Sequence, residues 1–517
     1  MADALMKGLR TLGGVIRSRQ GDVGAVQWRQ YAGAVRAHGG RLLSLWASEG
    51  TSGHEGLCVH AVYATGPADA GELVVLHLPL AAGEALPDIS DHFPAVTRMQ
   101  RAAHDLLGID IAQHRDTRPW LRHGAWTDAE FPLRRKFNAP RESTSATDRY
   151  AFVPVTGDGV HEIPVGPVHA GIIEPGHFRF HVVGERVLRL EERLGYVHKG
   201  IEKRFESMSP ADGARLAGRV SGDSTVAYTW AYAMAVENAI GTVVPARALW
   251  LRALLLERER IANHLGDLGY LGNDAGFAFG LSQFSRLKED LLRLNASLFG
   301  HRYLMDLIVP GGVNRDLDAA AIAPLRKQNR VLAKEVAELR RIYDEHPGVQ
   351  DRFIRTGIVT PELADRLGLC GLAGRASGIA PDARVQFPHA PYDQLAVRSA
   401  FHRGGDVAAR VNVRFDEIAE SVRLIDAILD ATPGGDVRVA LAPAPEGAFS
   451  LGLVEGWRGE ILVALHIGPN ESIRRLHPHD LSWQNWPVLE HAVIGNIVPD
   501  FPLINKSFNL SYSGHDL

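Results

Sequence analysis

The stretch GRVSGDSTVAYTWAYAMAVENAIG, residues 218–241, predicts a turn that opens a long apolar helix, which ends at the last glycine. Ser221, Gly222, Asp223 and Ser224 lie at the entrance of this helix. Free backbone N–H groups and small polar side chains at such an entrance suit a ligand or a metal ion. An ordinary N-cap, in which Ser221 or Asp223 satisfies the first turn, explains the same residues, and the local sequence favours it.

The composition of the 517 residues, 45% hydrophobic and 22% charged, is that of a globular protein with more than one domain. A net charge of −4 gives no indication of nucleic-acid binding, and no run reaches the roughly 18 apolar residues of a membrane helix. The N-terminus lacks the sustained apolar segment of a secretory signal. Cys58 and Cys370 are the only cysteines. Two distant cysteines cannot hold a zinc or iron–sulfur site and indicate a reducing compartment, so any iron–sulfur cluster belongs to a partner chain.

Residues 1–140 form the first predicted domain, of α+β type. RLLSLWA, LCVHAVYA and ELVVLHLPL, between residues 41 and 80, are typical of strands, and a helix is predicted from residue 94 to Gly108. The Arg- and Trp-containing tail at residues 118–137 suits docking on a neighbouring surface. An ordinary solvated basic tail explains it equally well.

Residues 141–160 are predicted to be a linker, because they begin with a polar run rich in helix breakers, and residues 161–517 form the second domain. Two strands are expected near its start, turned at residues 184–185. The loop before them carries His169, Glu174 and His177. Such side chains can carry protons, although scattered exposed polar residues explain the loop as well.

Three long stretches of the second domain, residues 248–271, 283–300 and 325–343, have apolar residues at helical spacing. A helical bundle is therefore the predicted core, and the charged faces of these helices are interpreted as solvated surfaces. The predicted fold class is an α+β N-terminal domain followed by a mainly α-helical large domain with small β elements.

A family resemblance enters with RMQRAAHDLLGI at residues 98–109, followed by RPWL and FPLRRKF. These stretches resemble the small hydrophilic subunit of respiratory complex I, the 30-kDa type. The sequence departs from that family at Gln100, Ala102 and Ala103, where acidic residues are usual.

A longer series of motifs covers most of the second domain: GPVH, LGYVHKGIEK, AVENAIG, ERIANHLGDLG, VPGGVNRDL, RASGIAPDAR, WRGE and DFPLINKSF, in this order. They resemble the large subunit, of 49-kDa type, that is shared by complex I, where it frames the quinone site, and by membrane-bound energy-converting nickel–iron hydrogenases. EPGHFRF and NDAGFAFG are closest in character to the formate-hydrogenlyase type, which is similar in fusing the small domain to the large one.

The resemblance implies that the hydrogenase metal site has been lost. In the hydrogenases, two Cys-x-x-Cys pairs hold nickel and iron, and these positions match Ser221, Ser224, Ser511 and Gly514. Hydroxyl groups and a glycine cannot replace soft thiolates. We therefore expect no nickel–iron centre, no metal ligands and no cofactor bound by this chain itself.

The complex I branch implies a quinone in the same cavity, held by a Tyr and a His. The Tyr position falls on Gly222, so that contact is missing, whereas His169 and His177 are candidates for the His. By the resemblance, Glu174 occupies a proton-relay position, and we assign proton transfer to it. Asp223 is an additional acid beside the pocket.

The resemblance also places four residues around this pocket. His198 and Arg219 are expected to face a partner's cluster and to tune it. Asp382 and Arg384 are expected to be supporting or proton-path groups, and a structural ion pair between helices explains them equally well.

Together these features predict a subunit of a complex I-like or hydrogenase-like redox complex without nickel. Its expected partners are an iron–sulfur small subunit, whose cluster supplies electrons, and membrane subunits that move protons or other ions. A quinone-type molecule is the expected acceptor, and the subunit is expected to lie peripherally on the cytoplasmic face of a membrane. Two alternatives remain: a redox-silent scaffold between the soluble and membrane arms, or reduction of a small substrate other than quinone.

Overall fold

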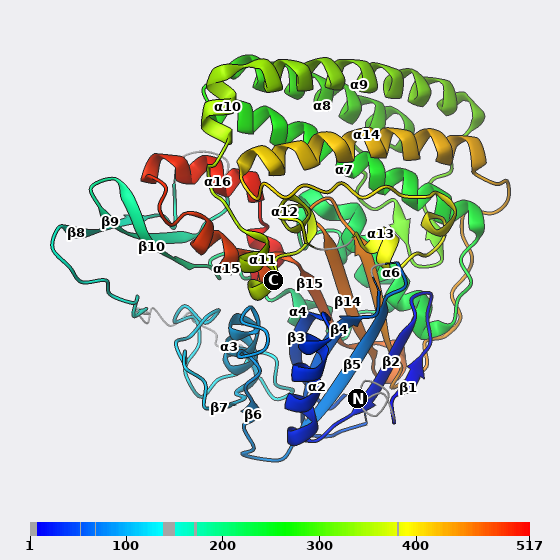
Figure 1. The fold of residues 1–517 in the computed structure, drawn as a ribbon. Coiled ribbons are helices and arrows are strands. Elements are labelled where there is room, and N and C mark those ends of the chain that lie inside the picture. Colours follow the sequence, from blue (N-terminus) through cyan, green and yellow to red (C-terminus); the bar gives the residue numbers. More distant parts are fainter. Residues whose placement is uncertain (1–7, 52, 68, 138–149, 170–172, 380–381) are drawn as a thin grey trace.

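The computed structural model describes residues 8–51, 53–67, 69–137, 150–169, 173–379 and 382–517. A region that contains a large sheet comes first, and a mainly helical region follows (Figure 1). Residues 141–149 of the predicted linker lie outside the described residues. Among those that are described, no helix has the length and hydropathy needed to cross a bilayer.

The N-terminal region is built on a five-stranded sheet of order β1-β2-β5-β4-β3. Its strands are β1 (Arg10–Leu12), β2 (Ser18–Asp22), β3 (Arg41–Glu49), β4 (Leu57–Thr65) and β5 (Glu72–Leu80). The three longest strands coincide with the three that the sequence predicts. The sequence did not predict β1, β2 or helix α2 (Ala25–Ala37). Helix α3 (Val96–Leu107) ends as predicted at Gly108, whose left-handed φ of 70° suits a glycine.

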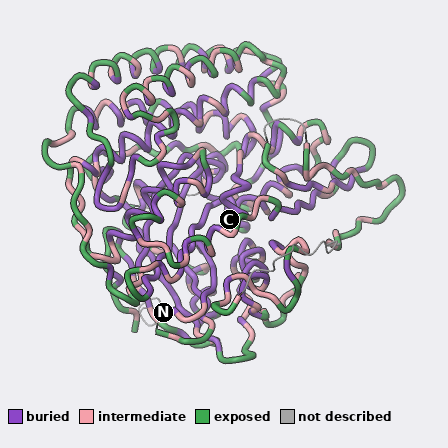
Figure 2. Tube along the Cα trace, turned by 180° about the vertical axis from the view of Figure 1, so that it is seen from behind, coloured by how far each residue is buried: buried purple, intermediate pink, exposed green. Residues whose placement is uncertain are grey.

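Four long helices lie side by side in the C-terminal region (Figure 1). They are α7 (Ala246–Asp274), α8 (Ala278–Phe299), α9 (Ala319–Glu345) and α14 (Val407–Ala431). Helix α9 is the outermost and has one buried stripe, whereas α7 is buried along most of its length (Figure 2). The first three match the predicted helices. The sequence analysis missed α14.

Helix α6 (Thr225–Ile240) is the predicted central helix, and it is buried on all sides. It packs against an antiparallel sheet of β13 (Phe449–Glu455), β14 (Glu460–Ile467) and β15 (Ile473–Asp480). The contact is close: the Ser450 hydroxyl donates to Ala235 O at 2.6 Å, and Gly452 lies directly beneath the helix backbone. This sheet therefore fixes where the entrance of α6 lies.

A second small sheet consists of β8 (Val160–Val165), β9 (His177–Val183) and β10 (Arg186–Arg193). Strands β9 and β10 form the predicted pair with its turn at residues 184–185. The remaining helices near the site are α15 (Ser482–Ala492), α16 (Phe501–Phe508) and the short C-terminal α17 (Tyr512–Asp516), with α4 (Ile201–Phe205) and α5 (Pro210–Ala217) between β10 and α6.

The predicted tail docks on the C-terminal region. Trp120 is 1% exposed, lies beneath the guanidinium groups of Arg98 and Arg101, and approaches His515 with ring centroids 5.7 Å apart. Arg118 pairs with Glu191 of β10 at 2.5 Å. The solvated-tail alternative is therefore wrong for these residues.

Buried histidines join the N-terminal sheet to the sheet of β13–β15. His60 Nδ1 lies 2.7 Å from His77 Nδ1, and the His466 ring lies 5.3 Å from the His60 ring. His477 Nε2 is 3.0 Å from the Ser44 hydroxyl across the same interface. Burial lowers the pKa of His77 to about 4, and it holds the pKa values of His60 and His466 well below the usual range. These side chains are therefore neutral in the fold at neutral pH.

Acid is expected to destabilise this interface. The unfolded chain takes up protons on histidine below a pKa of about 6.5, whereas the fold keeps these histidines neutral, so stability is lost as pH falls below that value. The loss is about 1.4 kcal/mol per pH unit for each such histidine. Urea unfolding of the chain at about pH 7, 6 and 5 measures it. A free energy of unfolding that stays constant over this range would contradict the prediction.

Candidate functional site

The entrance of α6 is a single 3-10 turn, residues Gly222–Ser224, and neither Ser221 nor Ser224 caps it with its side chain. The first free N–H groups of the helix instead donate to the carboxyl group of Glu259 on α7, from Val226 N at 2.6 Å and from Ala227 N at 3.2 Å. The N-cap alternative is therefore wrong, and the polar side chains of the turn are engaged elsewhere.

The two pairs of positions that the resemblance matches to cysteines, represented by Ser221 and Ser511, meet across 290 residues of sequence. Ser511 begins α17, where its hydroxyl accepts from Gly514 N at 2.9 Å. The same hydroxyl lies 3.0 Å from the Ser221 hydroxyl, which in turn donates to Asp223 at 2.8 Å. Because Ser221 uses its one proton on Asp223, Ser511 must donate to Ser221. The result is a directed chain of hydrogen bonds that ends on the Asp223 carboxylate.

Arg458, from the turn between β13 and β14, closes this chain. Its guanidinium donates to both oxygens of Asp223, at 2.9 and 2.5 Å, and to the Ser224 hydroxyl at 3.3 Å. Burial alone would raise the pKa of Asp223, but attraction to Arg458 outweighs it and lowers that pKa. Asp223 is therefore a carboxylate at neutral pH. Arg458 belongs to the WRGE motif, but the sequence alone predicted no role for it.

Gly514 leaves no room for a side chain. A Cβ atom there would lie 2.7 Å from the Tyr228 hydroxyl, 2.8 Å from an Asp480 carboxylate oxygen and 2.9 Å from the Ser511 hydroxyl. Tyr228 donates to Asp480 at 3.0 Å. The space that a side chain at residue 514 would need is thus filled by a polar pair from α6 and β15.

A cavity of about 320 Å³ opens beside this cluster. It is lined by Gly222, Asp223, Glu259, Ala262, Asn263, Lys288, Leu292, Asn295, Arg302, Tyr303, Leu304 and Met305. The Asp223 side chain is 40% exposed and faces this space, whereas the Arg458 side chain is only 7% exposed. The sequence analysis did not select Glu259 or Lys288, because charged positions on α7 and α8 were interpreted as solvated.

The described residues of the loop before β9, and His177 at the start of β9, do not line the cavity. Glu174 is exposed and accepts a hydrogen bond from Ser513 N at 3.2 Å, so it touches the C-terminal helix. His177 is buried and donates to Gly166 O at 3.1 Å, and His169 donates to Gly176 O at 3.2 Å. Burial lowers the pKa of His177, so this side chain is neutral at neutral pH. Proton transfer by Glu174 stays a prediction.

His198 and Arg219, expected to face a partner's cluster, are both held by this chain. His198 donates to Asp516 O at 2.7 Å. Arg219 forms a bidentate pair with Asp306 at 2.5 and 2.7 Å, close to the surface. These contacts do not test a role toward a partner.

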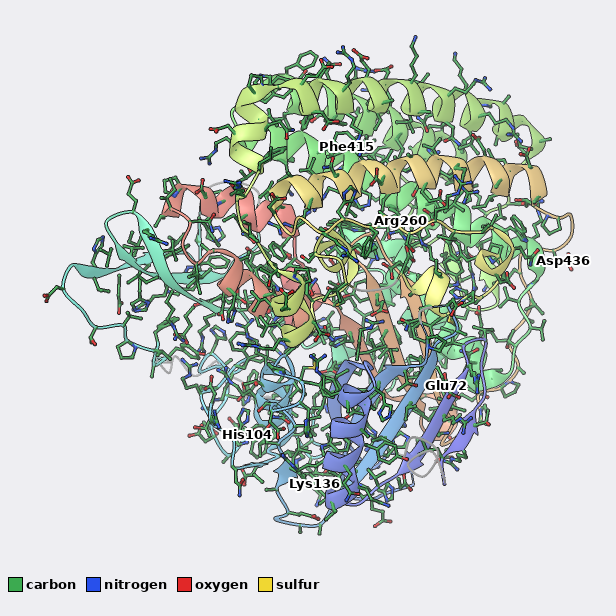
Figure 3. The ribbon with its side chains drawn as sticks, viewed as in Figure 1. Glu72, His104, Lys136, Arg260, Phe415 and Asp436 are labelled. Atoms are coloured by element: carbon green, nitrogen blue, oxygen red, sulfur yellow. The ribbon has the colours of Figure 1, made fainter. Side chains whose placement is uncertain are left out.

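Asp382 and Arg384 belong to a network of buried charges in the large region. Arg384 pairs with Asp382 at 2.6 Å and with Glu257 of α7 at 2.9 Å, and all three side chains are at most 1% exposed. One turn further along α7 lies Arg260, near the middle of the region (Figure 3), which donates to Glu455 O at 2.7 Å. Complete burial and reciprocal pairing favour the structural ion pair as the role of Asp382 and Arg384.

Two family models match the chain in succession. Residues 22–143 match the respiratory-chain NADH dehydrogenase 30 kDa subunit, and residues 274–446 match the 49 kDa subunit. Strands β3, β4 and β5 of the N-terminal sheet lie within the first match, and α8, α9 and α14 lie within the second. The two matches therefore define a chain in which a 30 kDa-type and a 49 kDa-type subunit of the respiratory complex are fused.

Whole-chain relatives agree with this assignment. Formate hydrogenlyase subunit 5 of Escherichia coli is 34% identical over 83% of this chain and 76% of its own length. The C/D subunit of the NADH-quinone oxidoreductase of Bacteroides fragilis is 28% identical over 76% of this chain and 78% of its own length. A chain of the membrane-bound sulfane sulfur reductase, an archaeal respiratory membrane complex, has a TM-score of 0.66 and 25% identity over 71% of this chain and 100% of its own.

The chain belongs to the family of fused 30 and 49 kDa subunits that includes formate hydrogenlyase subunit 5 and the C/D subunits of NADH-quinone oxidoreductases. The predicted resemblance to complex I and hydrogenase subunits is thereby confirmed.

Proposed function

We propose that this chain is the nickel-free large subunit of a membrane-associated redox complex. It receives electrons from an iron–sulfur cluster in a small partner subunit and passes them to a quinone-type acceptor. Membrane partner subunits couple this transfer to the movement of protons or other ions, and the subunit lies at the cytoplasmic face. The relatives, which include an NADH-quinone oxidoreductase subunit and a chain of a respiratory membrane complex, support this proposal.

The residues at the former metal site do not fit nickel and iron. The Ser511 hydroxyl bonds to the Ser221 hydroxyl, and the hydroxyls of Ser221 and Ser224 bond to Asp223. The fourth position is Gly514, where a Cβ atom would clash. Arg458 adds a positive charge beside them, which disfavours a cation. Within the described residues, no group of three or more His, Cys, Asp or Glu is arranged to hold a metal ion.

The purified complex should contain no nickel attributable to this chain and should neither take up nor release hydrogen. Elemental analysis against protein concentration, with a hydrogen electrode on the same sample, measures both. About one nickel per chain would contradict the proposal, because it would require ligands other than thiolates.

The cavity beside Asp223 is the proposed binding site of the electron acceptor. Its volume of about 320 Å³ falls in the range of small-molecule sites, and both apolar and polar side chains line it. It touches the turn that opens α6, where the resemblance implies the quinone head. The space left by Gly222, which replaces the family's Tyr, belongs to this cavity.

Filling the cavity tests this role. A Cβ atom on Gly222 would meet only Met305 Cε at 3.7 Å, an ordinary contact, so Gly222→Trp can enter the space without backbone strain. Quinone-dependent turnover of the assembled complex should fall about a hundredfold, since the acceptor loses its position. Gly434→Trp, at an exposed glycine with no neighbour within 4 Å, is the control. Full turnover in the Gly222→Trp complex would contradict the proposed acceptor site.

The second candidate function is a redox-silent scaffold. The observation that favours it is the saturated hydrogen-bond chain from Ser511 to Asp223 and Arg458, which resembles structural packing. Under this alternative, ion transport by the complex persists with the Gly222→Trp change and without any added acceptor. Reduction of a small non-quinone substrate, as the name of the sulfane sulfur reductase suggests, differs only in the molecule that enters the cavity.

A further inference from the structure

Lys288 is the lysine that lines the cavity. Lys288 lies on α8 and is half-buried, yet among the described residues no hydrogen bond or ion pair involves its ammonium group. A Cβ atom on Gly266 of α7 would lie 2.8 Å from Lys288 Nζ, so the absent side chain gives the ammonium group its place between the helices. Buried lysines are normally paired. An unpaired one at a cavity indicates a partner that comes from outside the chain.

The other charged side chains of the cavity are neutralised. Asp223 is paired with Arg458, and Arg302 forms a bidentate pair with Glu289 at 2.7 and 3.0 Å. Burial lowers the pKa of Lys288, although attraction to Asp267 and Asp223 opposes this. When the amine of Lys288 is protonated, the cavity carries one unbalanced positive charge. Such a site favours a ligand with a negative charge.

Glu259 is the acid that faces the same space. Its side chain is buried, and burial raises its pKa to about 8, although the two N–H groups at the start of α6 oppose this. Asp223 adds to the rise and Arg260 reduces it, and Lys288 lines the same cavity. Glu259 is therefore protonated at neutral pH. Both carboxyl oxygens accept backbone N–H groups, which leaves the acid proton for a ligand.

We propose that Lys288 and Glu259 mark the part of the cavity where the acceptor is reduced. The ammonium group of Lys288 binds the oxygen or sulfur anion of the acceptor, and the carboxylic acid of Glu259 protonates it. This inference rests on the proposed function. For a quinone, the partner's cluster supplies two electrons, Glu259 transfers its proton to the quinone oxygen held by Lys288, and water supplies the second proton. Water then returns a proton to the Glu259 carboxylate, so hydroquinone forms with charge and protons balanced.

An anionic sulfur chain presents a similar anion to Lys288, since it arrives with the charge that a quinone gains only on reduction. For tetrasulfide, two electrons from the partner's cluster break one S–S bond and Glu259 protonates the released sulfide, so hydrosulfide and trisulfide form and water returns the proton to Glu259. Separate assays distinguish a quinone from a sulfur chain as the acceptor. A short-chain ubiquinone analogue and inorganic tetrasulfide are offered separately to the assembled complex with a reducing donor. The compound that gives turnover identifies the acceptor. Binding of either compound requires the ammonium group of Lys288.

Three variants test the residues. Lys288→Met should raise KM for the acceptor at least tenfold, while Lys288→Arg, which keeps the charge, should restore most of the affinity. Glu259→Gln should lower kcat about a hundredfold with little change in KM. Wild-type kcat should fall as pH rises through about 8, because Glu259 loses its proton, and this fall should be absent from the residual activity of Glu259→Gln. Lys334→Met, at an exposed lysine of α9, is the control.

Glu174→Gln separates this proposal from proton transfer at the loop before β9. If Glu174→Gln lowers kcat a hundredfold and Glu259→Gln behaves as wild type, the proposal is overturned. Equal KM values in Lys288→Met and Lys334→Met would overturn the binding part.

A binding measurement needs no turnover. Calorimetry of tetrasulfide with the assembled complex should show affinity at least tenfold weaker for Lys288→Met than for wild type, and equal affinities would overturn the proposal. If the wild type binds tetrasulfide through Lys288 but reduces neither acceptor, the proposed function fails and the anion site stands.

Discussion

Replacing Arg384 with Met lowers the free energy of unfolding of the full chain by about 4 kcal/mol. Arg384 is the partner of both Asp382 and Glu257, at 2.6 and 2.9 Å, and neither carboxylate is accessible to water. Met fills much of the space of the arginine stem, but it removes the ion pair of Asp382 and leaves Glu257 with Arg260 at 3.3 Å. Breaking a buried pair from one side is more costly than removing it whole, because the remaining charge stays desolvated.

Arg341→Met is the matched control for this experiment. Arg341 also bonds to two carboxylates, Glu338 and Glu345 of α9, but its side chain is 56% exposed. The expected loss is within about 1 kcal/mol, since water screens exposed pairs. Urea unfolding of both variants decides between the two roles of Arg384. If Arg384→Met is as stable as Arg341→Met and only turnover falls, the proton-path role is correct and the structural pair is wrong.

The contrast between these arginines also explains where the sequence was informative. The charges of α9 are solvated, as the periodicity predicted, because its apolar stripe is separate from its polar faces. On α7, however, Arg252, Arg258 and Arg260 are all 0% exposed. Helix α14 was missed for the same reason, since buried charges such as Arg410 and Arg414 conceal its apolar pattern. Charge patterning along one helix does not reveal a partner on another.

Strands follow the same rule. The N-terminal strands β3 to β5 are rich in apolar and β-branched residues and were predicted, whereas β15, IRRLHPHD, reads as a polar loop. Its polar side chains are buried because they pair with distant segments, as His477 does with Ser44 of the N-terminal sheet and with Glu202 of α4. Residues far apart in sequence supply those partners, so local patterns cannot show them.

The candidate site was predicted through the family resemblance, which placed Ser221 and Ser511 close together in the fold. The hydrogen bond between their hydroxyl groups agrees with this placement. Arg458 was missed because its ion pair with Asp223 spans 235 residues. Lys288 was missed because its distinguishing property is the lack of a partner, which only packing reveals.

Gly452→Ala should destabilise the chain by about 3 kcal/mol, the upper end of ordinary overpacking. A Cβ atom at Gly452 of β13 would lie 1.9 Å from Ala231 O and 2.9 Å from Ala235 N, both backbone atoms of α6. Neither atom can move aside as a flexible side chain would. The helix and the strand must therefore separate along their whole contact.

The same separation reaches the candidate site. Helix α6 carries Asp223 at its entrance, and Arg458 follows directly after β13, so moving one element from the other stretches their ion pair of 2.5 and 2.9 Å. Urea unfolding measures the stability of Gly452→Ala, and acceptor-dependent turnover of the assembled complex measures the site. Gly434→Ala is the control, because its Cβ atom would meet nothing within 4 Å. Equal stabilities of Gly452→Ala and Gly434→Ala would show that the sheet does not fix the position of α6. Other contacts would then have to hold the entrance turn of α6 against Arg458.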